Sequence, residues 1–68
     1  MDKNWVKIFS THEIYKAELL KGLLEENDIT AIIVNKKDSS YLFGEAEIFV
    51  TADDVVKAKH LITQNDQL

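Results

Sequence analysis

The segment from Phe9 to Asn27, FSTHEIYKAELLKGLLEEN, carries the longest regular apolar pattern in the chain. Its apolar residues recur at steps of three and four, as they do on one face of an α-helix. These residues are Ile14, Ala17, Leu20 and Leu24, with Leu19 and Leu23 widening the stripe. The charged residues left for solvent are Lys16, Glu18, Lys21, Glu25 and Glu26. The pattern predicts an amphipathic helix against which the shorter segments of the chain pack.

Both ends of this helix carry sequence signals. Ser10 and Glu13 fit the capping box, in which the hydroxyl binds the amide three residues on and the glutamate reaches back. Phe9 and Ile14 occupy the positions of the hydrophobic staple that often accompanies it. The dipeptide 27–28, Asn-Asp, is expected to end the helix, because both residue types tolerate the left-handed backbone conformation.

Three short segments have the composition of β-strands. Asn4–Phe9 is rich in β-branched and aromatic residues, Thr30–Val34 has high strand propensity, and Glu45–Val50 alternates between its two faces. The intervening segment Asn35–Gly44 contains turn-forming residues and is expected to be a long hairpin loop.

A second helix is expected after the third strand. Thr51 and Asp54 offer an N-terminal cap, although Asp is not the usual partner at that position. The apolar stripe of this helix would consist of Val55, Ala58, Leu61 and Ile62. The polar residues 64–68 are expected to fray.

The predicted element order is β-α-β-β-α, which is an α+β fold in a single domain of residues 1–68. It looks like a ferredoxin-like fold that lacks its last strand. We expect a three-stranded mixed sheet in the order 1-3-2, with the first strand parallel to the third and both helices on one face. The residues expected in the core are Val6, Ile8, Ile14, Ala17, Leu20, Leu24, Ala31, Ile33, Ile48, Val55, Ala58 and Ile62.

Composition restricts the class of protein. A chain of 68 residues without cysteine cannot rely on disulfides or a cysteine-based zinc site, and a domain of this size is marginally stable alone. A net charge of −4 argues against nucleic acid as the partner. No apolar run is long enough for a membrane span, and the first residues lack the apolar region of a signal peptide. We therefore expect a cytoplasmic protein that binds neither nucleic acid nor membrane.

Three stretches carry a resemblance to a known family: Trp5–Phe9, Ala17–Glu25 and Asn35–Val50. Together they resemble the small bacterial family described as "putative prokaryotic signal transducing protein", a domain of unknown function, and the last stretch is similar to the form found in Bacteroidetes. The resemblance implies a ferredoxin-like fold similar to that of the P-II regulators, and no enzymatic activity. Many family members have Gly at the position of Asp28 here.

The loop between the second and third strands is the first candidate site. In P-II regulators the corresponding connection carries recognition, so the resemblance favours this position. Its lysines and hydroxyls suggest a site for an anion or a carboxylate. The candidate residues are Lys36, Lys37, Asp38, Ser39, Ser40 and Tyr41. The alternative is a solvated turn in which Asp38 and Ser39 bind their own backbone.

Signals for catalysis and metal binding are weak. His12 and His60 are the only histidines, and neither has the spacing of a zinc site, so we expect them at the surface. No histidine lies near the loop serines in sequence to activate a nucleophile. We expect no cofactor, no metal and no enzyme. Two functions stay open: a regulatory or interaction module that binds a protein or a small ligand, and a minor enzyme or metal-binding accessory protein.

The sheet face without helices is the second candidate site. Strict alternation places large apolar side chains there, which is unusual unless something packs on them. These residues are Trp5, Ile32, Val34 and Phe49. Phe9 is in conflict, since the staple requires it near the helix and alternation places it outside. We expect a homodimer through this face or through the open edge of the first strand. The alternative is a monomer whose outer face is screened by Lys7, Glu45 and Glu47.

Overall fold

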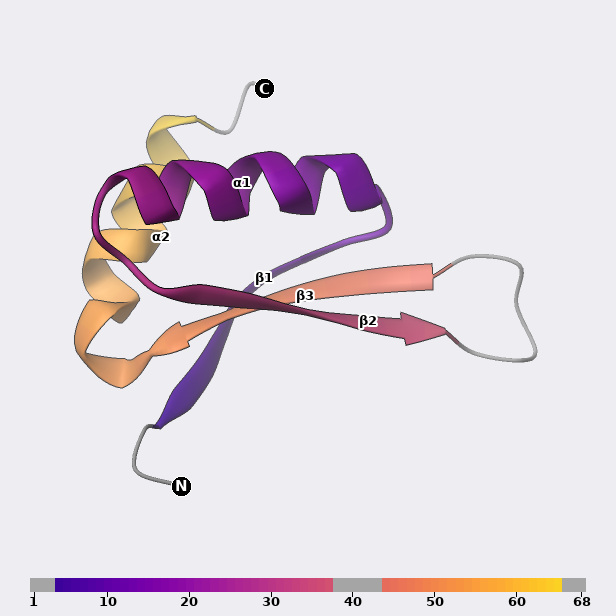
Figure 1. The fold of residues 1–68 in the computed structure, drawn as a ribbon, viewed down its shortest axis with the longest axis horizontal. Coiled ribbons are helices and arrows are strands. Elements are labelled where there is room, and N and C mark those ends of the chain that lie inside the picture. The colour runs from indigo at the N-terminus through magenta and orange to yellow at the C-terminus, as the bar shows by residue number, and fades with distance from the viewer. Residues whose placement is uncertain (1–3, 38–43, 66–68) are drawn as a thin grey trace.

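The computed structural model describes residues 4–37 and 44–65 of the chain (Figure 1). The elements, in order, are β1 (Trp5–Thr11), α1 (Ile14–Glu26), β2 (Ala31–Lys37), β3 (Gly44–Thr51), a short 3₁₀ turn η1 (Ala52–Asp54) and α2 (Val55–Gln64). The predicted β-α-β-β-α order is confirmed. Of the residues 64–68 expected to fray, Gln64 is instead the last residue of α2 and the Asn65 amide donates to the Ile62 carbonyl at 3.1 Å, while residues 66–68 lie outside the described part.

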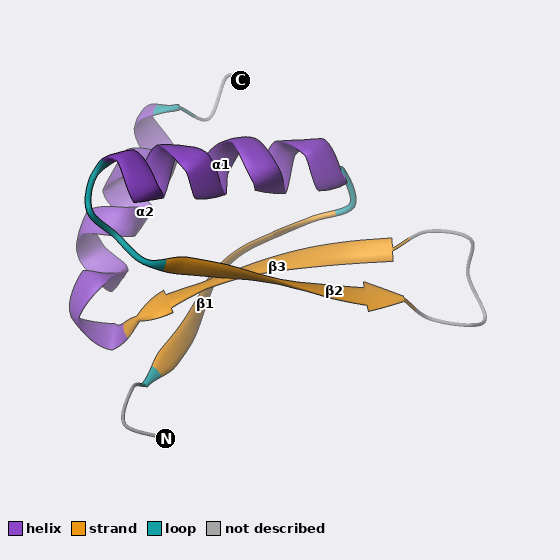
Figure 2. Cartoon of the chain, in the orientation of Figure 1, coloured by secondary structure: helices purple, strands orange, loops and turns teal. Residues whose placement is uncertain are grey.

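The three strands form one sheet in the order β1-β3-β2, as predicted, and both helices pack on the same side of it (Figure 2). Both strand pairings are antiparallel. The expected parallel pairing of the first and third strands, and with it a mixed sheet, is therefore wrong. The reason is geometric: the α1 crossover makes β1 and β2 run in the same direction, and the hairpin reverses β3, which lies between them and opposes both.

A β-bulge in β1 resolves the conflict over Phe9. Lys7 lies opposite Phe49, but the next paired residue of β1 is Phe9, opposite Ile48, so that Ile8 is the extra residue. Such an insertion interrupts the alternation of the strand. Ile8 and Phe9 are consequently both half-buried and both packed against the core under the helices.

The N-terminus of α1 differs from the predicted capping box. Ser10 pairs with Glu47 as part of β1, and the helix begins at Ile14 with Glu13 as its N-cap, without a side-chain cap. The Glu13 amide instead donates to Thr11 Oγ1 at 3.1 Å. Strand pairing extends two residues further than the sequence suggested and removes Ser10 from the helix end.

The C-terminus of α1 ends as predicted, at Asn27 and Asp28. Asp28 has a φ of 64°, in the left-handed region. Its amide donates to the Glu25 carbonyl at 3.1 Å, and the Ile29 amide donates to the Leu24 carbonyl at 3.0 Å. These two bonds define a Schellman motif, in which the first residue after the helix turns the chain back. The motif leads directly into β2.

The N-terminus of α2 uses the predicted pair in a different way. Thr51 Oγ1 donates to Asp54 Oδ2 at 3.2 Å, so the two side chains bind each other rather than the helix amides. Asp54 is the last residue of η1, at whose start the Ala52 amide donates to the Asn4 carbonyl at 2.8 Å. This bond fixes the beginning of η1 against the start of β1.

The core lies between the helices and the inner face of the sheet. Its buried residues are Ala17, Leu20, Leu24, Ile29, Ala31, Ala46, Ile48, Val50, Ala58 and Ile62. Seven of the twelve predicted core positions are thus buried, and four more are half-buried: Val6, Ile8, Ile33 and Val55. 

Ile14 is the exception among the predicted core residues, because its side chain is exposed. With the helix starting at Ile14 itself, this residue stands at the end of the apolar stripe, beyond the cover of the sheet. Ile29 was missed because it lies in the turn between α1 and β2, where helical and strand periodicity are both absent. It is buried through the Schellman motif, which commonly brings the second residue after a helix against its last turn.

Candidate functional site

The helix-free face of the sheet brings together side chains from all three strands. The register aligns these side chains in rows across β1, β3 and β2. One row consists of Lys7, Phe49 and Ile32, and the next consists of Ser10, Glu47 and Val34. Trp5 lies opposite Thr51 at one end of the face, and Glu45 lies opposite Lys36 at the other. We refer to this set as the open face. The four residues predicted to lie on it, Trp5, Ile32, Val34 and Phe49, all do so.

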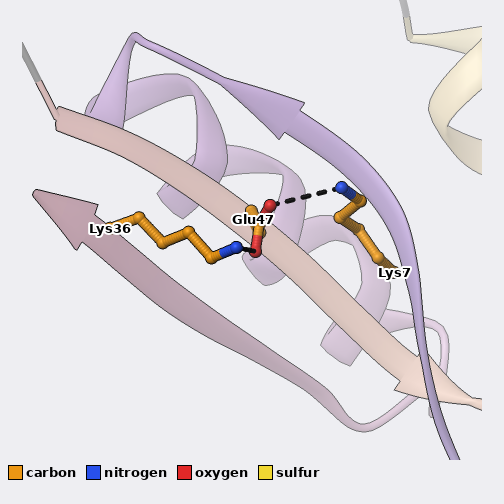
Figure 3. Close-up of polar contacts among 3 residues, drawn as sticks. All are labelled: Lys7, Lys36 and Glu47. Carbon is orange, nitrogen blue, oxygen red and sulfur yellow. Dashed lines mark hydrogen bonds and ion pairs between the residues drawn. The ribbon is translucent and has the colours of Figure 1, made fainter. Parts of the chain in front are cut away.

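A buried carboxylate lies at the centre of the open face (Figure 3). The Glu47 side chain is only 6 % exposed, although both described helices pack on the other side of the sheet. Lys7 Nζ donates to Glu47 Oε2 at 3.2 Å, and Lys36 Nζ lies 3.4 Å from Oε1. Glu47 therefore binds one ammonium group on each side, from the two strands that flank β3 in the sheet.

The strand register explains why these three side chains meet. Lys7 lies directly opposite Phe49, and Lys36 lies directly opposite Glu45. Glu47 is two residues away from each of those partners, so both lysines reach it diagonally. Diagonal neighbours on one face are about 7–8 Å apart at the backbone, a span that a lysine side chain covers.

The lysines also set the protonation of Glu47. Burial of the carboxyl by itself raises its pKa, but the hydrogen bond from Lys7 and the charges of Lys36 and Lys7 lower it by more. The pKa of Glu47 consequently lies below its ordinary value of 4.5. Glu47 is ionised at neutral pH, and the three groups carry one net positive charge.

The outward parts of both lysines remain in solvent. Their side chains are 52 % exposed for Lys7 and 65 % exposed for Lys36. An ammonium group has three donors, so each lysine keeps donors beyond those directed at Glu47. Around them, Ile32 and Val34 are each 38 % exposed, and Phe49 is half-buried. The open face thus combines apolar surface with oriented cationic groups.

The loop site is only partly described. Lys36 and Lys37 belong to β2, which runs three residues beyond the predicted strand end at Val34. The other loop candidates, Asp38, Ser39, Ser40 and Tyr41, lie outside the described residues. Lys36 is directed at Glu47 on the open face, so this loop candidate joins the face instead.

Sequence reasoning missed Lys7 and Glu47 as members of a site. It assigned both residues a screening role, because alternation alone gives the face of a strand but not the register between strands. The available signal was the position of one of the two acidic residues of this strand, Glu47, between apolar neighbours near the middle of the strand. Glu47 stands between Ala46 and Ile48, and such a residue needs a partner when it is buried.

The two histidines and Tyr15 lie outside the open face and do not form a cluster with each other. His12 Nδ1 lies 3.3 Å from the Gly44 carbonyl at an exposed position, and His60 is exposed on α2. The Tyr15 hydroxyl donates to Glu13 Oε2 at 2.6 Å, and this bond together with the Glu13 charge raises the pKa of Tyr15. Among the described residues, no three His, Cys, Asp or Glu side chains are grouped as a metal site would require.

None of the helices within residues 4–37 and 44–65 has the length and apolar character that crossing a membrane requires.

Comparison with known proteins identifies a family. Residues 5–66 match the model of the family described as "putative prokaryotic signal transducing protein". This range contains every strand and helix of the described structure. No curated protein and no solved structure gives a match to the chain. The chain belongs to the family of "putative prokaryotic signal transducing" proteins, as its sequence resemblance predicted.

Proposed function

We propose that this chain is a small cytoplasmic regulatory module without enzymatic activity, and that it binds a protein partner through its open face. The family description supports a role in signal transduction. The observation that carries the proposal is the arrangement around Glu47, where a buried carboxylate orients Lys7 and Lys36 within an apolar surface.

The chemistry of the open face is that of a protein–protein interface. Such interfaces are enriched in aromatic residues at the centre, with charged groups that are paired or placed at the rim. Trp5 and Phe49 provide aromatic surface, and the lysines are held in position by Glu47 before any partner arrives. Preorganised groups lose less conformational entropy on binding, which favours affinity.

The shape of the face favours a protein over a small ligand. Small molecules are usually bound in concave sites that enclose most of their surface. The open face is one side of a three-stranded sheet, which suits a partner that offers an extended surface of its own. Acidic and apolar side chains on the partner would match the lysines and the apolar residues.

A capture experiment tests this function. The full chain, immobilised and exposed to a lysate of its source organism, is compared with Trp5→Ser and Phe49→Ser. Val56→Ser is the matched control, because Val56 is an 83 % exposed apolar residue of α2, which packs on the opposite side of the sheet from the open face. We expect a protein that the wild type and the control retain and that both open-face variants lose.

Circular dichroism of each variant confirms that the fold is kept, and Trp5→Ser replaces a half-buried residue at the end of an edge strand. Retention of the same proteins by both open-face variants would exclude the open face as the binding surface. Loss of capture in the Val56→Ser control would assign binding to the helices instead.

A further inference from the structure

We propose that two copies of this chain associate through antiparallel pairing of their β2 strands, with Ile32 of each copy opposite Val34 of the other. The two sheets would join into one of six strands. This inference concerns the edge of the sheet and holds whether or not a protein partner binds the open face.

The first support is the difference between the two sheet edges. Both β1 and β2 have a neighbouring strand on one side only, within the described residues. An unpaired edge is a template for another strand, and bulges protect against this. β1 contains the bulge at Ile8, whereas β2 pairs with β3 over seven residues without a shift in register. Regular backbone groups are therefore available at β2.

The second support is that one register sets apolar side chains of β2 in one copy opposite apolar side chains of β2 in the other. Pairing about Ile33 sets Ile32 opposite Val34 and Ala31 opposite Asn35, on the faces that they already occupy. The side chains of Ile32 and Val34 are both 38 % exposed in the single chain, and they would form an apolar cluster of four across the two copies. Opposing apolar pairs of this kind stabilise antiparallel sheets.

Other registers fit less well. Pairing about Val34 uses the full length of the strand, but it sets Ile32 opposite Lys36. Pairing about Ile32 keeps apolar residues together, but it leaves only residues 31–33 paired within the strand. A shift by one residue would put the open face of one copy beside the helix side of the other.

The third support is the distribution of charge along β2. The residues that lead into the strand include Glu26 and Asp28, which are both exposed, and Lys36 lies near its other end with a side chain that is 65 % exposed. Antiparallel pairing brings the basic end of each strand to the acidic end of the other. The net charge of −4 makes two copies repel each other on average. Antiparallel pairing of β2 places opposite charges near each other, so this contact is electrostatically complementary.

The expected consequence is a single extended face. A two-fold axis perpendicular to the sheet relates antiparallel edge strands, so the open faces of both copies lie on the same side. The Lys7–Glu47–Lys36 groups would then occur twice on one surface, with the cluster of Ile32 and Val34 between them.

Association of the unmodified full chain is the first test. Light scattering from micromolar to millimolar concentration should show a mass that rises toward twice the 7.8 kDa of one chain. Over the same range, hydrogen exchange should slow at the alternate β2 amides that do not bind β3, and β1 amides should not change. A constant monomer mass over this range, or protection that rises at β1 instead, would overturn the proposal.

Cysteine pairing tests the register, because the chain has no cysteine of its own. Ile32→Cys and Val34→Cys are oxidised separately and as a mixture, with Val56→Cys as the exposed control for random collision. In the proposed register only the mixture places two thiols directly opposite, whereas like residues are diagonal and too far apart for a disulfide. We expect mixed disulfide dimers to form on the order of a hundredfold faster than control dimers, because pairing raises the effective concentration of the second thiol from roughly ten micromolar to the millimolar range.

Two results would refute the register. Faster disulfide formation by Val34→Cys alone would show pairing about Val34, and faster formation by Ile32→Cys alone would show pairing about Ile32. Equal rates for the mixture and the Val56→Cys control would refute pairing of β2 altogether. Circular dichroism of the reduced variants shows whether each is folded before oxidation.

Discussion

Asp28 provides the sharpest test of the backbone geometry. It follows α1 in the left-handed conformation, with a φ of 64°, where its amide closes the Schellman motif. Glycine is the usual residue at this position because it has no Cβ to clash with the backbone. Asp28 also places a negative charge at the negative end of the helix dipole. Asp28→Gly should therefore stabilise the protein.

The expected gain can be worked out from three contributions. Relief of the left-handed conformation is worth about 1 kcal/mol, at the low end for non-glycine residues because Asp tolerates it better than most. Removing the charge from the helix C-terminus adds about 0.3–1 kcal/mol. The greater freedom of glycine in the unfolded chain takes away about 0.4–1 kcal/mol. The net result is a gain near 1 kcal/mol, or about 4–8 °C in Tm for a domain of this size.

Asp28→Asn separates the two favourable contributions. Asparagine keeps a side chain suited to the left-handed region but has no charge, so it should gain only the electrostatic part. Urea unfolding of the wild type and the two variants at low and high salt measures the electrostatic and the conformational contribution separately. The gain of Asp28→Asn should shrink in high salt, and Asp28→Gly should lose the same electrostatic part of about 0.3–1 kcal/mol while keeping what relief of the left-handed conformation contributes. A Gly variant no more stable than the wild type would refute the assignment of strain to Asp28.

The fold was predictable to the extent that it depends on local periodicity. The stripe of α1 correctly places Ala17, Leu20 and Leu24 in the core, because these residues form one helical face however the rest is arranged. The strand order followed from the crossover connection and the hairpin. Strand direction was misjudged, although the same connections determine it.

Local signals failed where two elements compete for the same residues. Ser10 has the sequence context of a helix cap, but its backbone pairs with Glu47 in β3. Ser10 pairs in the sheet rather than capping α1, because its partner strand β3 lies far away in the sequence. A local sequence pattern contains no information about such a partner. The adjacent apolar residues Ile8 and Phe9 were the sequence signal of the bulge, since strict alternation could not place both of them on the core side of the sheet.

The candidate site depends on register, which explains why it was only half predicted. The apolar members of the open face follow from alternation alone. The meeting of Lys7 and Lys36 at Glu47 requires the bulge in β1, the extension of β2 and the alignment of both strands on β3. None of these is encoded within a single segment of the sequence.

Three further predictions concern the core, the helix and the open face. Leu20→Ala removes a fully buried side chain of α1 and should lower the free energy of unfolding by about 2–5 kcal/mol in urea titrations; a near-neutral effect would contradict the assigned helix face. Gly22→Ala should raise the free energy of unfolding by about 1 kcal/mol, since an added Cβ at this exposed helical position meets no atom within 4 Å. Destabilisation would show that the helix is crowded at this position. Glu47→Gln tests the charge at the centre of the open face. Because the folded-state pKa of Glu47 lies below the ordinary value of 4.5, its ionised form contributes stability that is fully present above that pH and is lost as the pH falls through the folded-state value. At pH 7 the variant should therefore be less stable than the wild type, since Lys7 and Lys36 lose their shared carboxylate. The difference in urea midpoint should stay constant at pH values well above 4.5, where the carboxyl is ionised in the folded and the unfolded chain, and should then narrow toward pH 3 as Glu47 of the wild type becomes protonated. An equal stability at pH 7, or a difference that persists unchanged at pH 3, would show that the lysines do not stabilise the ionised carboxylate.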